Sequence, residues 1–429
     1  MDTAAHIEQT IRAHRLPGLD AHTPSTFIHP HYDGYAIANL PPTIAAMLGV
    51  ELPDMAPTLP PALWEDLTPG IRRVVLVILD AVGYRNLRQL ADEEPALEHL
   101  SRAGQMFPLT SVFPSTTVAA LTTLWTGRTP GEHGFLGTKL LLAEQGMLAN
   151  MLALSPAAHR QHNALVDWGW EPDTFVTVPS LGQQLTEHGV QTIAHTHSTF
   201  IGGSLTRIFT RGMADVRGHL SMYDMWIHLR HTLQETSASV AFISVYWGHV
   251  DGLAHVYGPG SESYNGMLRD LFRSLERECL GQLSSSEREG TLLLVTADHG
   301  QIASPPEKIV WLSEHPDLQR LLLVPPAAES RAAYLYVRPG QADAVRAYVA
   351  EHLGGRFLTL DAEQAIATGL FGPRELPLDL RSRVGDLLLL AQDDSRLLVR
   401  KEPTPFYGHH GSLTPEEMLV PLLMVRLDQ

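Results

Sequence analysis

The sequence contains almost no cysteine, since Cys279 is the only one among 429 residues. A single cysteine cannot close a disulfide within the chain, and it cannot build a metal cage of thiolates. Any metal ion must therefore be bound by histidine and carboxylate side chains. The sequence also lacks a run of about 18 apolar residues, so it predicts no transmembrane helix and no membrane partner.

Basic residues are scarce: 31 lysines and arginines face 47 aspartates and glutamates, which gives a formal net charge of -16. A protein that tracks the phosphate backbone of nucleic acid needs a basic surface, so this composition excludes that class. Such acidity commonly serves solubility, and part of it is available to gather around cations. The N-terminus has neither the basic stretch nor the apolar stretch of a secretory signal, so we expect a cytoplasmic protein.

Apolar runs alternate with helical patterns along the first 300 residues. Strands separated by helices are typical of an α/β fold, in which helices cover both faces of a mainly parallel sheet. The run at 73–80 contains six consecutive β-branched or leucine residues, 74–79, as expected for a strand buried on both faces. The other expected strands are 109–112, 190–194, 239–246 and 291–296, and the expected helices are 84–103, 117–125, 181–187 and 264–280.

The regular alternation of expected strands and helices ends after residue 304. Strands are expected at 333–337, 386–390 and 396–399, and a helix at 342–352, which together predict a smaller α+β insertion over 305–400. The catalytic α/β core would then comprise 71–304 and 401–429. The first 70 residues are rich in proline and histidine, with one short helix at 39–48, and we expect them to wrap the surface.

Metal-capable side chains follow two of the expected buried strands. Asp80 ends the first strand, while Asp298 and His299 follow the strand at 291–296. Ligands of parallel sheets bind at the carboxyl ends of the strands, so these side chains are candidates for a metal site. Asp80 also suits the N-cap of a following helix. A buried strand that ends in Asp-His-Gly is hard to explain by packing alone.

Two further segments carry possible ligands. Asp251 and His255 are four residues apart, so on a helix they lie on one face and can grip one ion, or they form a solvated surface pair. His249 is out of phase with them. His410 lies in a glycine-flanked turn, but with 22 histidines in the chain it is weaker evidence by itself.

A candidate nucleophile lies where the strand near 109–112 stops and a helix of small residues begins. Ser115, Thr116 and Thr117 stand at this junction. A hydroxyl at a helix N-terminus meets the positive end of the helix dipole, and the free N–H groups there suit a phosphoryl oxygen. Capping the helix is the commoner fate of such residues. These arguments do not choose among the three.

Taken together, the segments resemble the alkaline phosphatase superfamily, especially its nucleotide pyrophosphatase/phosphodiesterase branch. The resemblance rests on the order of five motifs, over about 72–304 and again near 406: Val77-Ile-Leu-Asp80, Phe113-Pro-Ser-Thr-Thr117, Asp251-Gly-Leu-Ala-His255, Ala297-Asp-His-Gly300 and His410-Gly411. It implies an alkaline phosphatase-like core and makes Thr117 the nucleophile. It also implies one ion held by Asp80, Thr117, Asp298 and His299, and another held by Asp251, His255 and His410.

The resemblance further implies hydrolysis of phosphodiester or nucleotide pyrophosphate bonds of small substrates, through a covalent phosphothreonine. Zinc is the expected metal, and Mn²⁺ also suits a set of histidine and carboxylate ligands. The branch carries an asparagine some twenty residues after the nucleophile, where this chain has Thr138 and Lys139. We expect one of these to contact the phosphoryl group instead. The sulfatase signature is absent.

Two other functions remain open at this level. The segment Gly411–Pro421 also resembles the C-terminal segment of cofactor-independent phosphoglycerate mutases, which favours a phosphomonoesterase or a metal-dependent phosphomutase. A metal-stabilised binding protein without turnover is the more distant alternative. It would require a broken ligand set, whereas every expected ligand position is filled here.

Overall fold

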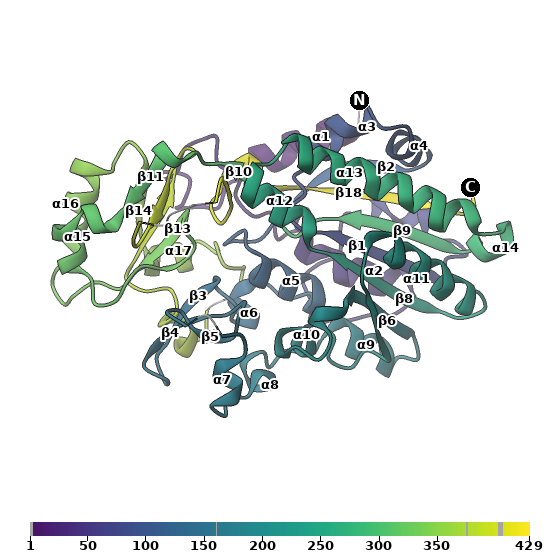
Figure 1. The fold of residues 1–429 in the computed structure, drawn as a ribbon, viewed down its shortest axis with the longest axis horizontal. Coiled ribbons are helices and arrows are strands. Elements are labelled where there is room, and N and C mark those ends of the chain that lie inside the picture. The colour runs from purple at the N-terminus through teal and green to yellow at the C-terminus, as the bar shows by residue number, and fades with distance from the viewer. Residues whose placement is uncertain (1–2, 160, 375, 402–405) are drawn as a thin grey trace.

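The main sheet of the protein has seven strands, in the order β2-β18-β9-β1-β8-β6-β7 (Figure 1). A computed structural model describes residues 3–159, 161–374, 376–401 and 406–429. The strand β18 runs antiparallel to both of its neighbours, and the other pairs are parallel. The predicted mainly parallel sheet is therefore confirmed. Its strands are β1 (Arg73–Leu79), β2 (Gln105–Thr110), β6 (Gln191–His197), β7 (Asp215–His219), β8 (Ala241–Trp247), β9 (Thr291–Thr296) and β18 (Leu419–Arg426).

The central strand β1 sets the position of the candidate site. All seven of its residues are buried, six of them apolar, and the buried guanidinium of Arg73 donates to the backbone carbonyls of Leu233, Glu287 and Glu289. It pairs in parallel with β8, where Leu79 lies opposite Trp247, and with β9, where Ile78 lies opposite Thr296. The three strands thus end at the same edge of the sheet. The residues that directly follow them come close together in space.

Helices cover both faces of this sheet (Figure 1). The helix expected over 84–103 is in fact two helices, because proline at position 95 disfavours a helical conformation in the residue before it. Glu94 is accordingly extended, with φ -111° and ψ 110°. The helices are α2 (Leu40–Met47), α3 (Tyr84–Ala91), α4 (Pro95–Ala103), α5 (Thr117–Thr126), α9 (Leu181–Glu187), α11 (Met222–Glu235) and α13 (Glu262–Ser274).

Helix α13 is shorter than the helix predicted over 264–280. It ends at Ser274 and continues as a π-helical turn, Leu275–Cys279, in which the free cysteine is buried. Within the described part of the chain, no helix has the length and apolar character needed to cross a membrane.

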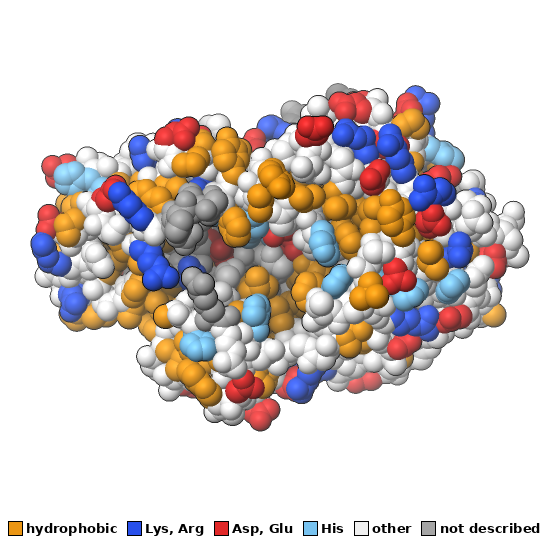
Figure 2. Space-filling model, viewed as in Figure 1, with side chains coloured by type: hydrophobic (Ala, Val, Ile, Leu, Met, Phe, Trp, Pro, Cys, Tyr) orange, Lys and Arg blue, Asp and Glu red, His pale blue; other side chains and the backbone are white. Residues whose placement is uncertain are grey.

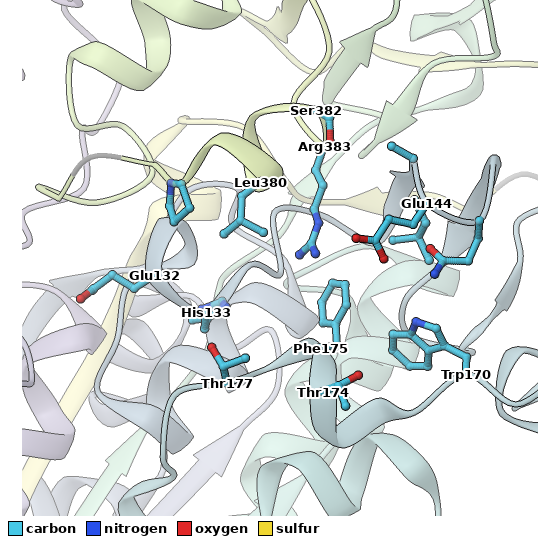
Figure 3. Close-up of a pocket in the computed structure, with 14 residues that line it drawn as sticks. Glu132, His133, Glu144, Trp170, Thr174, Phe175, Thr177, Leu380, Ser382 and Arg383 are labelled. Atoms are coloured by element: carbon cyan, nitrogen blue, oxygen red, sulfur yellow. The ribbon is translucent and has the colours of Figure 1, made fainter.

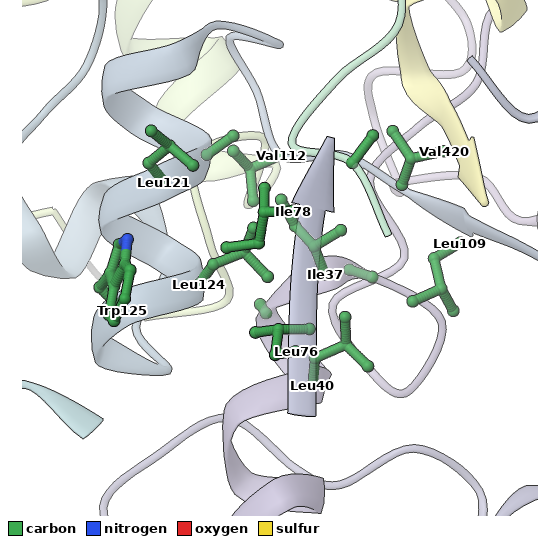
Figure 4. Packing of buried hydrophobic residues seen from close by; sticks show 14 of the residues in the cluster. Ile37, Leu40, Leu76, Ile78, Leu109, Val112, Leu121, Leu124, Trp125 and Val420 are labelled. Carbon is green, nitrogen blue, oxygen red and sulfur yellow. The ribbon is translucent and has the colours of Figure 1, made fainter. Parts of the chain in front are cut away.

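Helix α5 packs its apolar side chains against the central strand. Figure 4 shows Leu121 and Leu124 of α5 beside Leu76 and Ile78 of β1, with Ile37 from the N-terminal segment closing the cluster. The N-terminal segment goes deeper than a surface wrap, because residues 36–45 are all buried. Its expected helix is present as a short 3-10 turn (Ile37–Asn39) followed by α2.

A second sheet lies beside the core and is built from two distant parts of the chain. Its strands, in order, are β14 (Phe357–Asp361), β15 (Leu387–Ala391), β13 (Ala332–Leu335), β12 (Ala327–Ala328), β3 (Lys139–Leu142), β4 (Met147–Asn150) and β5 (Ser155–Pro156). Four of these lie within the expected insertion over 305–400, together with α16 (Ala342–His352). Of the seven strands, β13 and β15 were predicted and the other five were not, while the strand expected at 396–399 is β16 (Arg396–Leu398), which pairs with β11 (Ile309–Trp311) instead. The domain boundaries stay a prediction.

A cavity of about 390 Å³ lies between this second sheet and the core (Figure 3). The guanidinium of Arg383 lies over the ring of Phe175, 4.2 Å from its centroid. His133, the last residue of α6 (Pro130–His133), contributes to the wall. The backbone N–H of Phe135 donates to His133 Nδ1 (3.2 Å), so Nε2 carries the proton beside Thr123 Oγ1, at 3.1 Å. Burial lowers the pKa of His133 to about 3.

The neutral form of His133 should make the protein less stable in acid. The folded-state pKa lies below the unfolded value, so its contribution is complete above about pH 6.5 and is lost as the pH falls towards 3. Between pH 8 and pH 5 we expect it to remove about 2 kcal/mol from the free energy of unfolding. Urea unfolding of the wild type and of His133→Gln at both pH values measures this. An equal pH dependence in the two proteins would contradict it.

Candidate metal centre

Three buried metal-capable side chains meet where β1 and β9 end. Asp80 directly follows β1, and Asp298 and His299 follow β9 after one residue. One donor atom of each lies within 4.8 Å of the other two. His299 Nε2 is 3.6 Å from Asp80 Oδ1 and 3.5 Å from Asp298 Oδ2. The structure thus brings together the three residues that the strand ends predicted to be neighbours.

Thr117 is the first residue of α5, and its hydroxyl faces this group. Its Oγ1 lies 3.2 Å from His299 Nε2. The other two candidate hydroxyls are engaged elsewhere: Thr116 Oγ1 lies 3.0 Å from Thr138 Oγ1, and Ser115 donates to the carbonyl of Ser412. Thr116 occupies the N-cap position, but its side chain makes no capping hydrogen bond. Of the three hydroxyls at this junction, that of Thr117 lies against the candidate metal centre, and its role as nucleophile stays a prediction.

A second group of donors adjoins the first and shares His299 with it. Asp251, His299 and His410 offer donor atoms within 4.8 Å of one another. On α12 (His249–Tyr257), His255 Nε2 lies 3.4 Å from Asp251 Oδ1, as the four-residue spacing predicts. The rings of His299 and His410 stack with centroids 3.9 Å apart. In this arrangement His299 lies within reach of both groups, whereas the family resemblance assigned it to one.

Backbone carbonyl groups orient the three histidines in the same way. The Nδ1 atoms of His255, His299 and His410 lie 2.7, 3.0 and 2.9 Å from the carbonyl oxygens of Gly408, Gly300 and Ser115, respectively. Each Nδ1–H therefore donates to a carbonyl, which leaves the Nε2 lone pair free. This is the usual way in which a protein fixes the tautomer of a metal-binding histidine.

The ionised state of the carboxylates in this site is unfavourable unless a cation binds beside them. Burial, followed by the nearby charges of Asp298 and Asp251, raises the pKa of Asp80 well above its usual range. Burial likewise raises the pKa of Asp298. Among the described residues, Asp80 Oδ1 and Asp298 Oδ2 are buried without a hydrogen-bond partner. Unpartnered buried oxygens are expensive unless a cation binds them, so the residues fit a metal ion.

Two residues that the sequence did not single out hold the carboxylates in place. Tyr246 donates from its hydroxyl to Asp80 Oδ2 at 2.5 Å, and Gln301 donates from Nε2 to Asp251 Oδ1 at 2.5 Å. Tyr246 lies on β8 opposite Ile78, two residues before Asp80. The only sequence feature that could have indicated this contact is the position of Tyr246 near the end of a strand. That position predicts a contact with Asp80 only when the register between β1 and β8 is known.

Thr138 and Lys139, the predicted phosphoryl contacts, lie in different surroundings. The N–H of Thr138 donates to Glu329 Oε1 at 2.7 Å, and its hydroxyl meets that of Thr116. Lys139 begins β3 and is exposed. Burial raises the pKa of Glu329, a residue that the sequence did not indicate. Thr138 is therefore linked to the residue next to Thr117, and both phosphoryl-binding roles stay predictions.

An ion pair buried at 0% exposure joins the second sheet to the segment that follows His410. Arg331 donates from Nε and Nη2 to the two oxygens of Glu417, at 2.8 and 2.9 Å. The same carboxylate accepts from the backbone N–H of Ser412 and from the hydroxyl of Thr414, at 2.9 and 2.7 Å. All of its strong acceptor positions are thus used, as a buried charge requires.

The backbone of Glu417 also reaches the other side of the site. Its carbonyl accepts from the N–H of Gly300, at 2.8 Å. Gly300 packs directly against the backbone of this segment, because a Cβ at its position would lie 2.1 Å from the carbonyl oxygen of Glu416. Only glycine fits there. Glu417 therefore holds both Gly300, the residue after His299, and Ser412, two residues after His410.

The two histidines of the Gly408–Gly411 turn differ in their surroundings, which makes the choice of ligand testable. His409 belongs to neither donor group: its Nδ1 lies 3.1 Å from Ser330 Oγ, and burial lowers its pKa to about 2. We expect His410→Ala to remove about one equivalent of bound metal, because Nε2 of His410 faces Asp251. Elemental analysis of the dialysed protein measures this loss. His409→Ala is the matched control, and the reverse pattern would assign the site to His409.

A second, larger cavity of about 910 Å³ opens beside the candidate metal centre, with Asp80, Thr117 and Asp251 in its wall. Figure 2 shows this face of the molecule, which is hollowed near its middle with hydrophobic and histidine side chains around the hollow. The Thr117 hydroxyl is thus accessible to a ligand in this space.

Comparison with known structures identifies the fold. An inactive variant of murine ectonucleotide pyrophosphatase/phosphodiesterase 5, in complex with AMP, aligns with a TM-score of 0.61 and 16% identity, over 82% of this chain and 87% of that chain. Phosphonoacetate hydrolase from Sinorhizobium meliloti, in complex with phosphonoformate, gives a TM-score of 0.60 and 18% identity, over 83% of this chain and 90% of that chain. The predicted alkaline phosphatase-like fold is confirmed. Curated protein sequences give no match.

The family model for type I phosphodiesterase/nucleotide pyrophosphatase matches residues 74–413. This range begins within β1 and ends after His410, so it includes every candidate ligand and Thr117. The chain therefore belongs to the type I phosphodiesterase/nucleotide pyrophosphatase family, and with it to the hydrolases of phosphate esters.

Proposed function

We propose that this protein hydrolyses phosphodiesters, with Thr117 as the nucleophile and two divalent metal ions held by the aspartates and histidines of the candidate metal centre. The observation that carries the proposal is the place of the Thr117 hydroxyl. It lies at the N-terminus of α5, 3.2 Å from His299 Nε2, and on the wall of the larger cavity. A hydroxyl without activating neighbours is a poor nucleophile, and here metal-capable donors adjoin it.

The donor groups suit two cations. The Asp80, Asp298 and His299 group and the Asp251, His299 and His410 group together bring three carboxylates into one site, with no lysine or arginine among their members. His255 adjoins the second group through Asp251. Bound divalent ions would compensate this charge, stabilise the deprotonated threonine and the leaving oxygen, and thereby supply the electrophilic part of the chemistry. Zinc suits these donors, and Mn²⁺ is the alternative.

Thr117 would form and then lose a covalent bond to phosphorus. Its oxygen attacks the phosphorus atom, the bond to the leaving alcohol oxygen breaks, and the alcohol takes up a proton. Water then hydrolyses the phosphothreonine and restores the hydroxyl. The N-cap residue of α5 makes no side-chain hydrogen bond to the first turn, so the backbone N–H groups there would be available to phosphoryl oxygens.

A preference for diesters tests the reaction class. Among the described residues, no lysine or arginine lines the larger cavity, so a monoester dianion would find no cationic side chain there. We expect bis-p-nitrophenyl phosphate to be cleaved at least about tenfold faster than p-nitrophenyl phosphate, in kcat/KM, a difference of about 1.4 kcal/mol in barrier. Release of p-nitrophenol at pH 8 with Zn²⁺ or Mn²⁺ measures both rates.

The opposite result has a defined meaning. A faster monoester would favour a phosphomonoesterase, and isomerisation of a phosphosugar would favour a phosphomutase. No turnover of any ester, with both metal sites filled, would favour a metal-stabilised binding protein.

A further inference from the structure

The larger cavity beside Thr117 is apolar over most of its wall. Its polar end lies at the candidate metal centre, and the wall leads away from it along α5 and α10 (Ser204–Phe209). At about 910 Å³ the cavity has the size of a site for a whole small molecule rather than for a phosphate alone. The apolar part of the wall includes Leu121, Trp125, Leu152, Phe200, Leu205 and Phe209.

The carboxylates in the wall of this cavity lie at the metal end. Among the described residues of its wall, the only carboxylates are Asp80 and Asp251, and there is no lysine or arginine. Burial lowers the pKa of His195 to about 3, so its ring is neutral at pH 7. A second phosphate on a ligand would therefore be buried without a partner charge, which is costly.

We propose that this cavity receives an uncharged aryl or alkyl group, so that the substrates are phosphodiesters of apolar alcohols rather than nucleoside di- or triphosphates. The proposal rests on the proposed function and adds the class of substrate. Leu152 and Phe200 support it at the rim, since they are 48% and 44% exposed although both are large and apolar. A bound apolar group would cover them and gain the free energy of their burial.

A series of p-nitrophenyl diesters that differ only in the second ester group tests this inference. The groups are methyl, phenyl, n-octyl and thymidine 5′, so the leaving group stays constant. We expect kcat/KM for the phenyl and octyl esters to exceed that for the methyl ester at least about tenfold, and to exceed that for the thymidine ester. ATP should be the poorest substrate. Equal rates across the series, or a preference for the thymidine ester or ATP, would overturn the proposal while the proposed function stands.

A binding measurement keeps the inference testable if no ester is hydrolysed. Calorimetric titration of the metal-loaded protein with phenylphosphonate and with methylphosphonate should show at least about tenfold tighter binding of the phenyl compound. Absence of turnover alone would overturn the proposed function. Equal affinities of the two phosphonates would overturn the proposal that the cavity receives an apolar group.

Rim substitutions identify the surface responsible. Phe200→Ser and Leu152→Ser replace partly exposed side chains, so the fold should tolerate them. We expect each to lower the phenyl-to-methyl ratio of kcat/KM at least about threefold, since apolar contact is lost. Leu323→Ser is the matched control, because this leucine is 53% exposed and lies outside the cavity wall. A ratio unchanged in both rim variants would contradict the assignment.

Discussion

Replacing Thr117 by alanine should lower turnover of a phosphodiester by about a thousandfold or more, with little change in folding or metal content. The covalent route disappears with the hydroxyl, and only direct attack by water remains. Metal should still bind, because Asp80, Asp298 and His299 are untouched. Single-turnover and steady-state rates of the metal-loaded variant measure the effect. Thr117→Ser, which keeps a hydroxyl, should recover a substantial part of the activity.

Thr116→Ala is the matched control for this experiment. Thr116 is one residue away, but its hydroxyl meets Thr138 rather than His299. Loss of that hydrogen bond should cost about 1 kcal/mol of stability and leave most of the turnover. If Thr117→Ala, folded and metal-loaded, kept more than about a tenth of wild-type turnover, the barrier would have changed by less than about 1.4 kcal/mol. Thr117 would then not be the nucleophile.

Removing the metal ions should abolish turnover, and it should also destabilise the protein. Asp80 and Asp298 are buried with oxygens that no described residue satisfies, so the metal-free site retains unbalanced polar groups. At a free metal concentration of about one hundred times Kd, binding should add about 2.7 kcal/mol to the free energy of unfolding. The denaturation midpoint therefore reports on the metal independently of activity.

The test begins with protein from which a chelator has removed the metal ions, and elemental analysis verifies their removal. Zn²⁺ and Mn²⁺ are then returned separately, and both turnover and the midpoint of urea unfolding are followed. Mg²⁺ is a useful control, because it prefers oxygen ligands in octahedral geometry and should fill these histidine sites poorly. Full turnover by protein shown to contain no metal would remove the proposed mechanism.

The core of the fold was predictable because its signals are local. The strands β1, β8 and β9 are mainly apolar runs, and Asp80, Asp298 and His299 lie within three residues of strand ends. Where parallel strands end together, the side chains after them must meet. The position of these candidate ligands therefore follows from chain order and strand register alone.

The second sheet was only half predictable, because its pairing is long-range. The strands β3 and β12 are paired although about 190 residues separate Lys139 from Ala328 in the sequence. The strands β3–β5 are short and lack a clear alternation, so nothing local shows that they join the 305–400 strands. The helix break at Pro95 was missed for a different reason: the surrounding apolar periodicity continues across it.

The residues that support the site left little trace in the sequence. Tyr246, Gln301 and Glu417 are ordinary polar residues, and their role appears only when Asp80, Asp251 and the turn after His410 are placed beside them. The family resemblance singled out Thr117 among three hydroxyls, whereas the contacts of each hydroxyl needed the direction of its side chain. Sequence order predicts which segments meet, while orientation depends on the folded backbone.

The ion pair between Arg331 and Glu417 has an evolutionary consequence. A change of either residue alone leaves a full charge in a dry interior, so single steps away from the pair should be strongly disfavoured. The two positions are expected to change together or not at all. Exchange of the second sheet for that of a relative would have to bring along a matching partner for residue 417. The second sheet is thus inherited together with the segment that follows His410, one of the candidate metal ligands.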